Sequence, residues 1–420
     1  MMSSQEVSQG YKQTKVGVIP EEWEVARIGD VFNFIKTYSN SRKDLSAIGD
    51  IEYLHYGDIH TKYKYHLNFD KNTLPKISLE KFKTNIQYVE NGDLFIADAS
   101  EDYVDIGKSV EAINLNDKKV VSGLHTFLLR DKDNNFSNGY KGLILYNQNI
   151  SKNIKRIATG ISVLGISKTN LGKLEIPLPP LKEQQKIANI LTTWDNAVSK
   201  QDELIKAKEE LKKGLMQKLL SGEVRFEGFD REWEEVRFSK FLTEVSQKSK
   251  IENEYQILSS TIKDMELRDG RVDAKTNIGY KILKKNQLVL SPQNLWLGNI
   301  NFNTKFEIGL VSPSYKIFNI NTSILSVDFA KYIFKTNKML FEYKTCSEVG
   351  ASIVRRNLDL DSFYLIPIKL PSIEEQLKIA DVLTNTDKEI DLLKNELEVL
   401  KEQKKGLMQK LLTGEMRVRI

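Results

Sequence analysis

The nine residues KKGLMQKLL occur twice in this chain of 420 residues, at positions 212–220 and again at positions 404–412. A helix tolerates many sequences, so helix propensity alone does not account for nine consecutive identities. A duplicated module does account for them, and an internal repeat constrains a fold more strongly than any single residue. The sequence therefore predicts two tandem copies of one module, with an offset of 412 − 220 = 192 residues.

The repeat extends on both sides of this stretch. Residues 179–225 align with residues 371–417 without a gap, and 22 of these 47 positions are identical. Shorter matches lie upstream: Gly160, Ser162 and Ile176-Pro177 pair with Gly350, Ser352 and Ile366-Pro367 at an offset of 190, and Trp23, Glu24 and Arg27 pair with Trp233, Glu234 and Arg237 at 210. We therefore expect two dissimilar domains, residues 1–178 and 226–370, and two similar helical regions, residues 179–225 and 371–420.

The two dissimilar domains are expected to be mixed α/β domains. They contain short apolar or alternating runs such as GDLFIAD, VVSGLHTFLLR, KGLILY and YKILKKNQLVLSP, which are interrupted by Gly, Asn and Pro. Runs of this kind predict strands that are joined by loops.

Each helical region follows a proline-containing segment, and its apolar residues then recur at intervals of four and three. This spacing is typical of a coiled-coil seam. Lys212 and Lys404 occupy seam positions as well. The apolar residues of the predicted seam are Ile187, Leu191, Trp194, Val198, Ile205, Leu215 and Leu219 in the first helix, and Ile379, Leu383, Ile390, Leu393, Leu397, Leu400, Leu407 and Leu411 in the second.

The length of these helices favours packing of one on the other. About 40 residues of helix measure roughly 60 Å, which is too long for a small domain to cover. The predicted fold class is therefore α+β, with two globular domains separated by an antiparallel coiled coil and related by a pseudo-two-fold axis. The alternative is that each helix lies only on its own domain. Gly214 and Gly406 interrupt the helical pattern, which indicates a close helix approach, a hinge or simple tolerance.

Composition indicates a protein of the cytoplasm. The single cysteine, Cys346, excludes a disulfide framework and favours a reducing compartment. The first 15 residues lack the apolar core of a signal peptide. The longest uncharged run, residues 286–304, contains five Asn, two Gln and a Pro, so no membrane span is expected. A net charge of +5 permits a polyanionic partner without requiring one.

Motifs of catalysis and cofactor binding are missing from the sequence. Residues 107–109 read GKS like the end of a phosphate-binding loop, but Asp102 stands where that loop requires glycine. The four histidines are not accompanied by the cysteine ligands or the HExxH motif of a zinc site. We also find no glycine-rich cofactor loop followed by the tetrapeptide of a base methyltransferase. The sequence therefore predicts no metal and no cofactor for this chain.

One set of residues leaves a nuclease open as an alternative. Asp328, Glu342 and Lys344 are spaced as in some metal-dependent nucleases. Their surroundings, VDFAKYIFKTNKMLFEYK, predict an amphipathic helix rather than the strand that such a site needs. A structural coiled-coil scaffold is a second alternative, but it does not explain two long dissimilar domains between nearly identical frames.

The repeated frame carries a resemblance to a known family. Two variable domains, each followed by a helix that opens with IPLPPLKEQQKIA or LPSIEEQLKIA and closes with KKGLMQKLLSGEVRF or KKGLMQKLLTGEMRV, resemble the DNA-specificity (S, HsdS-type) subunit of type I restriction-modification systems. In the first variable domain, GDLFIADASEDYVDIGK and VVSGLHTFLLR are also similar to members of that family. The second variable domain matches only at its borders.

This resemblance implies a subunit without catalytic activity. Its two target-recognition domains would each read half of a split site in double-stranded DNA, and its helices would set the gap between the half-sites. Because the two domains differ, the site would be asymmetric. The helices would also bind two methyltransferase (M) subunits, and nuclease/translocase (R) subunits would join the complex. S-adenosylmethionine, ATP and magnesium would belong to those partners.

Candidate DNA contacts follow from side-chain chemistry. Lys, Arg, Tyr and Ser contact phosphates, whereas Arg reads guanine and Asn or Gln reads adenine. The alternative for any one of these residues is an ordinary solvated or buried side chain. The candidates are Lys62, Tyr63, Lys64, Tyr65, His66, Tyr103 and Lys108 in the first domain, and Gln293, Asn294, Trp296, Arg355 and Arg356 in the second.

Overall fold

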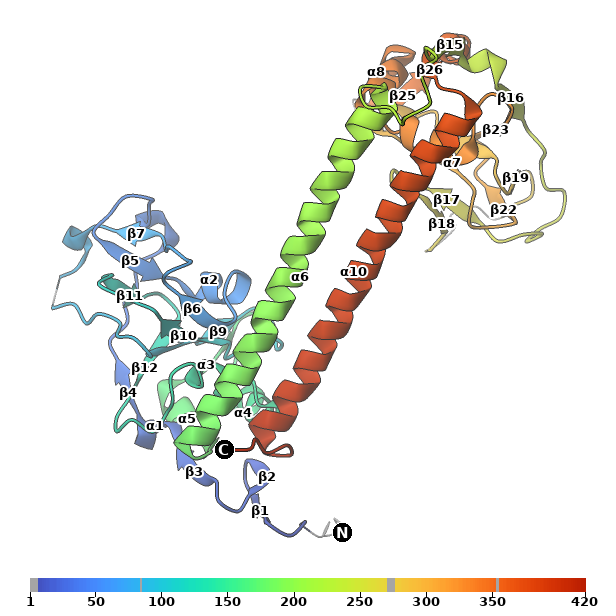
Figure 1. Ribbon diagram of the computed structural model, residues 1–420. Helices are drawn as coiled ribbons and strands as arrows, with labels where there is room; N and C mark the ends of the chain where they lie inside the picture. Colours follow the sequence, from blue (N-terminus) through green and yellow to red (C-terminus); the bar gives the residue numbers. More distant parts are fainter. Residues whose placement is uncertain (1–6, 84, 270–275, 353–354) are drawn as a thin grey trace. The chain divides into compact units, whose positions relative to one another are not determined.

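The computed structural model describes residues 7–83, 85–269, 276–352 and 355–420, and it divides the chain into two compact units (Figure 1). Unit 1 comprises Met1–Gln201 with Glu396–Ile420, and unit 2 comprises Asp202–Asn395. Helix α6 (Leu181–Ser221) begins in unit 1 and ends in unit 2, whereas α10 (Ile373–Thr413) begins in unit 2 and ends in unit 1. Each unit therefore contains one variable domain and one half of each long helix.

The variable domain of unit 1 is built on a five-stranded sheet. Its order is β4 (Phe32–Ile35), β12 (Thr126–Asp131), β8 (Leu94–Ala97), β10 (Ser109–Ile113) and β6 (Tyr65–Asn68). Neighbouring strands are antiparallel except for β10 and β6, which are parallel. All four residues of the central strand β8 are buried, which explains the continuous apolar run LFIA at this position.

Smaller elements complete unit 1. A three-stranded sheet has the order β11 (Val120–Ser122), β5 (Ile51–Leu54), β7 (Lys76–Ile77). Three two-stranded pairs are β1 (Tyr11–Thr14) with β2 (Gly17–Pro20), β3 (Glu24–Arg27) with β14 (Glu175–Leu178), and β9 (Ala99–Ser100) with β13 (Leu164–Gly165). The short helices are α1 (Ile28–Val31), α2 (Tyr56–Thr61), α3 (Lys141–Ile144), α4 (Gln148–Ile157) and α5 (Lys168–Gly172), with 3-10 turns η1 (Arg42–Asp44) and η2 (Leu79–Lys81).

One predicted strand of unit 1 is a helix instead. The first four residues of the run KGLILY form α3, Lys141–Ile144. Glu111 holds this segment, because its carboxylate accepts hydrogen bonds from the backbone of Gly139 and Gly142 at 2.8 and 3.0 Å. A short buried apolar run has no periodicity that separates a strand from a helix, so the strand prediction was wrong here.

Unit 2 repeats this plan with a smaller sheet. Its four antiparallel strands have the order β16 (Leu242–Val245), β23 (Lys316–Ile320), β20 (Leu288–Leu290) and β21 (Ile300–Phe302). The two-stranded pairs are β15 (Glu234–Arg237) with β26 (Pro367–Leu370), β17 (Leu258–Ser260) with β18 (Met265–Leu267), β19 (Lys281–Lys284) with β22 (Ile308–Val311), and β24 (Ser347–Ser352) with β25 (Arg355–Leu358). The helices are α7 (Val327–Ile333), α8 (Asn337–Thr345) and α9 (Leu360–Leu365), with 3-10 turns η3 (Phe238–Lys240) and η4 (Leu295–Leu297).

The two sheets correspond strand by strand. In chain order and in sheet position, β4, β8, β10 and β12 of unit 1 match β16, β20, β21 and β23 of unit 2. The duplication therefore includes the variable domains, where the sequences are dissimilar. The backbone N–H of Ile28 donates to Leu174 O and that of Phe238 to Ile366 O. Leu174 and not Ile176 is thus the counterpart of Ile366, which corrects the sequence alignment by two residues.

The long helices run antiparallel within each unit. In unit 1, Asp195 pairs with Lys404, and Gln201 donates to Glu396 at 3.1 Å. In unit 2, Lys208 pairs with Glu389 at 2.7 Å, and Lys212 pairs with Asp387. Partners that advance along α6 recede along α10, as an antiparallel pair requires. The α+β fold class with paired long helices is therefore confirmed.

The predicted seam residues lie at two depths. Buried side chains are Ile187, Leu191, Ile205, Leu219, Ile379, Leu383, Ile390, Leu397 and Leu411, and half-buried ones are Trp194, Val198, Leu215, Leu393, Leu400 and Leu407. Toward the helix ends, Ile187 and Leu191 also join the core of the first domain, and Ile379 and Leu383 join that of the second. The sequence offered two arrangements, in which the helices pack on each other or each lies on its own domain. Each arrangement therefore describes a part of the helices.

Gly214 and Gly406 have open space around them. A Cβ atom added at either position would meet no neighbouring atom within 4 Å, apart from the helix backbone itself. Neither glycine is therefore required by a close helix approach, and simple tolerance describes both positions. In the described part of the chain, no helix has the length and apolar character needed to cross a membrane.

Candidate nucleic-acid interface

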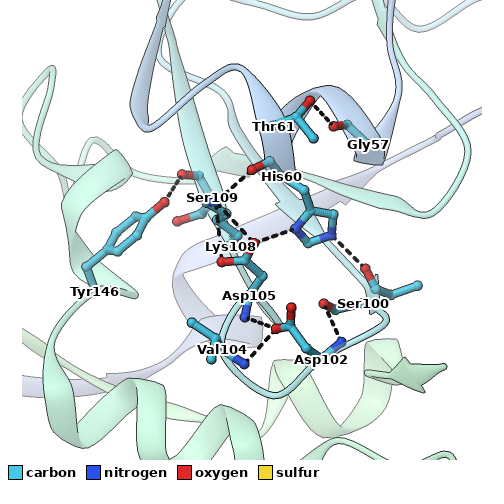
Figure 2. Close-up of polar contacts among 11 residues, drawn as sticks. Gly57, His60, Thr61, Ser100, Asp102, Val104, Asp105, Lys108, Ser109 and Tyr146 are labelled. Carbon is cyan, nitrogen blue, oxygen red and sulfur yellow. Dashed lines mark hydrogen bonds and ion pairs between the residues drawn. The ribbon is translucent and has the colours of Figure 1, made fainter. Parts of the chain in front are cut away.

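Residues 101–108 of unit 1 form a shaped loop between β9 and β10. Asp102 organises this loop, because its Oδ1 atom accepts hydrogen bonds from the backbone of Val104 and Asp105, both at 2.8 Å (Figure 2). Such an Asx turn fixes the backbone without a regular element. Tyr103 and Val104 are left exposed, Val104 by 79%. The loop therefore presents an aromatic and an aliphatic side chain on a defined backbone.

Lys108 ties this loop to helix α2. Its ammonium donates to the carbonyl of His60 at 2.8 Å and to Asp105 Oδ2 at 3.3 Å, as Figure 2 shows. His60 Nε2 lies 2.9 Å from Ala99 O. The charge of Lys108 is thus used inside the domain, where it positions the loop. His60 was not among the residues chosen from the sequence, because no motif surrounds it.

Helix α2 begins at a cluster of histidines around one tyrosine. The ring of Tyr56 lies 4.6, 5.8 and 5.4 Å from the rings of His55, His60 and His125. His55 Nδ1 accepts a hydrogen bond from Gly57 N at 3.2 Å, so a neutral histidine caps the helix. Burial lowers the pKa of His55, and Arg42 lowers it further by repulsion. Burial raises the pKa of Asp98, against the effect of His125 at 3.3 Å.

A second loop, residues 159–164, lies beside residues 101–108, because both adjoin the pair of strands β9 and β13. Strand β13 pairs with β9 through Leu164 opposite Ser100, so residues 159–164 end where residues 101–108 begin. Ile161 is fully exposed and Val163 is more than half exposed. Sequence reasoning used Gly160 and Ser162 of this loop only as a domain border. The available signal in the sequence was the pair of apolar residues Ile161 and Val163 in a loop.

The stretch of residues 62–66 is divided between surface and interior. Tyr65 is buried, with its ring 4.6 Å from that of Tyr146 and 4.3 Å from Lys404 Nζ. His66 Nε2 lies 2.7 Å from Gly139 O. Lys62 is exposed and pairs with Asp58 at 3.0 Å, Lys64 is exposed with its Nζ 5.0 Å from the Tyr65 ring, and Tyr63 is half-buried. Tyr65 therefore connects the variable domain to α10.

Residues 291–299 of unit 2 occupy the topological position of residues 101–108. They join β20 to β21, as residues 101–108 lie between β8 and β10. Gln293 is exposed, and with Asn294 it lines a polar cavity of about 410 Å³. Arg268, which sequence reasoning missed, lines the same cavity. Arginine and side-chain amides are the groups that read guanine and adenine edges.

A hairpin supports this second loop. Arg356 N, in β25, donates to Gln293 O at 3.2 Å. The Arg356 guanidinium donates to Ser347 Oγ at 3.0 Å and to Lys344 O at 3.3 Å, so it braces the hairpin. The backbone of Arg355 belongs to β25, and its side chain lies outside the described part of the structure. Trp296 is half-buried in η4, which packs on α8.

Buried polar contacts hold the base of residues 291–299. Ser260 Oγ donates to Asn299 Oδ1 at 2.6 Å, and Asn301 Nδ2 donates to Ser260 Oγ at 2.8 Å. Lys335 Nζ donates to Asn301 Oδ1 at 2.7 Å, and burial lowers the pKa of this lysine. Fully bonded buried networks make a surface rigid. Both loops are therefore held by polar contacts within their own unit.

The residues of the nuclease alternative belong to two helices. Asp328 lies on α7, where it pairs with Lys331 at 2.6 Å. Glu342 and Lys344 lie on α8. Within residues 7–83, 85–269, 276–352 and 355–420, no three His, Cys, Asp or Glu side chains gather as metal ligands would. The described residues therefore provide no support for a metal-dependent nuclease.

Fold and site together define a duplicated α+β chain with a loop at the equivalent position of each unit, residues 101–108 and residues 291–299. The family described as "Type I restriction modification DNA specificity domain" matches residues 20–209 and 232–402, and the chain belongs to this family.

A relative agrees with this family, and solved structures share the fold. A Methanocaldococcus jannaschii chain named as the specificity subunit of the MjaX type I restriction enzyme is 27% identical over 98% of this chain and 97% of its own. The HsdS subunit from Thermoanaerobacter tengcongensis has a similar fold, with a TM-score of 0.52 and 15% identity over 95% of this chain and 98% of its own. A chain from a structural study of assembly and conformational transition in the type I R-M system gives a TM-score of 0.56, with 13% identity over 95% and 99% of the two chains.

Proposed function

We propose that this chain is the DNA-reading subunit of a type I restriction-modification complex, and that each variable domain reads one half of an asymmetric, bipartite site in double-stranded DNA. The recognition domains would be residues 1–178 and 226–370, held by helical regions 179–225 and 371–420. The observation that carries the proposal is the equivalent position of residues 101–108 and 291–299 between corresponding strands.

The two loops differ in chemistry although they share a position. Unit 1 offers Tyr103 and Val104, with Ile161 from the neighbouring loop. Apolar side chains of this kind contact the methyl group of thymine. Unit 2 offers Gln293 and Arg268 around a polar cavity, a set suited to purine edges. Corresponding sheets that carry loops of different side-chain chemistry support a DNA site whose two halves have different sequences.

Phosphate contacts would come from exposed basic residues near these loops. Lys62 and Lys64 are exposed in unit 1, and contacts of this kind position a protein on DNA without specifying sequence. Lys108, Tyr65, His66 and Arg356 instead form internal contacts. We therefore assign these four residues to positioning the domains and their loops.

The partners of the chain would be enzymes, whereas the chain itself would be non-catalytic and without cofactor. Two methyltransferase subunits would bind along the helical regions, nuclease/translocase subunits would join them, and the complex would act on DNA in the cytoplasm. The family and the fold of the type I R-M chain described above support this assembly.

The proposal is tested with purified chain alone and with its methyltransferase partner. The chain alone should neither methylate nor cleave duplex DNA, with or without magnesium. Together with the partner and S-adenosylmethionine, it should direct methylation to one bipartite sequence. Metal-dependent cleavage by the chain alone that is lost in Glu342→Gln would overturn the proposal in favour of a nuclease.

A further inference from the structure

The N-terminal hairpin of unit 1, formed by β1 and β2, lies against the start of α4 and the C-terminal end of α10 (Figure 1). Tyr11 Oη donates to Gly414 O at 3.0 Å, and Asn149 Nδ2 donates to Val16 O at 3.0 Å. Val16 and Ile19 are buried in the core of this unit. The hairpin thus covers the place where helix α10 ends beside the start of α4.

Among the described residues of unit 2, no hairpin covers the corresponding place. By the offset of the repeat, Ser221 and Gly222 correspond to Thr413 and Gly414, and Lys338 holds the position in α8 that Asn149 holds in α4. After α6 the chain first makes the same contacts as after α10, because Arg225 binds Glu375 as Arg417 binds Glu183. Phe226, the next residue, then packs under Lys378 with its ring 5.5 Å from Nζ. A cavity of about 700 Å³ remains at this place, and Leu220, Ser221, Trp233, Lys338, Met339 and Ile368 are among the residues that line it.

This cavity has an apolar floor and a basic rim. Leu220, Met339 and Ile368 are buried side chains of the floor. Lys213, Lys338 and Lys369 are exposed at the rim. The carboxylate of Glu209 lines the cavity too, but Lys394 pairs with it at 2.6 Å. Lys213 lies 3.8 Å from Glu210, so Lys338 and Lys369 are the rim lysines that carry the argument. The charge that remains available to an occupant is therefore positive.

The hairpin of unit 1 indicates the shape of the missing occupant, and the rim indicates its charge. In unit 1 the occupant is a β-hairpin with two buried branched aliphatic residues three positions apart, Val16 in the turn and Ile19 in the extended strand β2. That hairpin carries Lys12 and Lys15, so the hairpin of a second copy would bring like charges to the lysine rim. An acidic segment of another protein is complementary.

We infer that this cavity of unit 2 binds an extended, acidic segment of the methyltransferase partner, which inserts branched aliphatic side chains over Leu220, Met339 and Ile368. The inference rests on the proposed function for the identity of the partner. It also makes the two units unequal as binding sites, because in unit 1 the N-terminal hairpin covers the corresponding place and leaves a smaller cavity of about 450 Å³ beside Tyr11, Asn149 and Thr413.

Charge reversal at the rim tests the inference. The double variant Lys338→Glu, Lys369→Glu should bind the methyltransferase subunit at least about tenfold more weakly at about 0.1 M salt, and the difference should shrink at about 0.5 M salt. The control is Lys240→Glu, Lys250→Glu, which makes the same charge change at exposed sites of unit 2 away from the cavity. Equal affinity of the rim variant, the control and the wild type would overturn the inference.

A photo-crosslinking residue at position 369 of the assembled complex identifies the occupant. The expected product joins position 369 to a methyltransferase peptide with more Asp and Glu than Lys and Arg. A complex that assembles without this product, or a product with a basic peptide, would refute the cavity assignment and leave the proposed function intact. Failure of the wild-type chain to bind the methyltransferase at all would refute the proposed function itself.

Discussion

Arg417 holds the buried carboxylate of Glu183 with both sides of its guanidinium, Nε at 2.8 Å from Oε1 and Nη2 at 3.1 Å from Oε2. Trp23 Nε1 donates to the same carboxylate at 2.9 Å. The counterpart in unit 2 is Arg225 with Glu375, at 2.9 and 2.7 Å. The two arginines are related by the repeat offset of 192 residues, and so are the two glutamates. The duplication is thus preserved at the level of single hydrogen bonds, and each pair connects the segment after one long helix to the start of the other.

Removing Arg417 should destabilise unit 1. Arg417→Ala leaves the fully buried Glu183 charge with Trp23 as its remaining partner. An uncompensated buried charge costs about 3 to 5 kcal/mol, and the partial exposure of Arg417 moves the expected loss to roughly 2 to 3 kcal/mol. Urea unfolding of the purified chain measures this loss. Arg419→Ala, at an exposed position near the same end, should change the free energy of unfolding by less than about 0.5 kcal/mol.

Acid should loosen helix α2 through His55. Burial lowers the pKa of His55 from its ordinary value of 6.5, so the unfolded chain binds a proton that the folded chain does not in the window between the lowered pKa and 6.5. Stability therefore rises with pH through this window and falls on acidification. Protonation also removes the acceptor for Gly57 N that caps the helix.

The matched variant for this effect is His55→Asn, which keeps a capping acceptor and does not titrate. Melting temperatures of both proteins between about pH 5 and pH 7.5 cover the histidine range. Acidification should lower the melting temperature of the wild type more than that of the variant. Because Asp98 is present in both proteins, its titration cancels in the comparison. Parallel pH profiles would contradict the role assigned to His55.

A charge within the helix pair should prevent assembly. Leu397 is 6% exposed, so Leu397→Asp buries an unpaired carboxylate at a cost of roughly 3 to 5 kcal/mol. We expect loss of the soluble complex with the methyltransferase. Leu392→Asp is the control on the same helix, because Leu392 is 63% exposed and its carboxylate would be solvated. Co-purification measures both outcomes, and normal assembly of the Leu397 variant would place the importance of the seam in doubt.

Single changes in the two loops should weaken different half-sites. Tyr103→Ala removes an exposed ring from residues 101–108, and Gln293→Ala removes an exposed amide beside the polar cavity of unit 2. Each should leave assembly intact and weaken binding by about 1 to 3 kcal/mol. Competition with DNA altered in one half-site separates the effects. If both variants relaxed discrimination at the same half-site, the assignment of one loop to each half would fail.

The sequence pattern was sufficient to predict the two long helices, because their apolar residues are periodic and the helices are repeated. The intervals of four and three residues predicted the helix seam, whose antiparallel pairing appears in the ion pairs of Asp195 with Lys404 and of Lys212 with Asp387. Side-chain chemistry also led to Tyr103 in one domain and Gln293 in the other, which lie in loops at the same topological position. Their part in DNA binding remains a prediction.

The rest depended on which face of an element is buried, and the sequence does not state this. Lys64, Tyr65 and His66 read as an exposed basic and aromatic stretch, but strand alternation turns Tyr65 toward Tyr146 and Lys404. Ile161 and Arg268 lie in loops, where no period marks them. The cavity of unit 2 could not be found without comparing the two units, because what defines it is that the described residues of unit 2 include no counterpart of β1 and β2 there.

The central claim, that each domain independently reads one half-site, is tested most directly by mapping methylated bases across the genome of cells that carry a domain exchange. Residues 20–175 are replaced by the corresponding region of another member of the family, and the methyltransferase partner is kept. The account predicts a methylated sequence in which one half-site is new, while the other half-site and the gap are those of the wild type. A map in which both half-sites change, or in which neither changes, would contradict it.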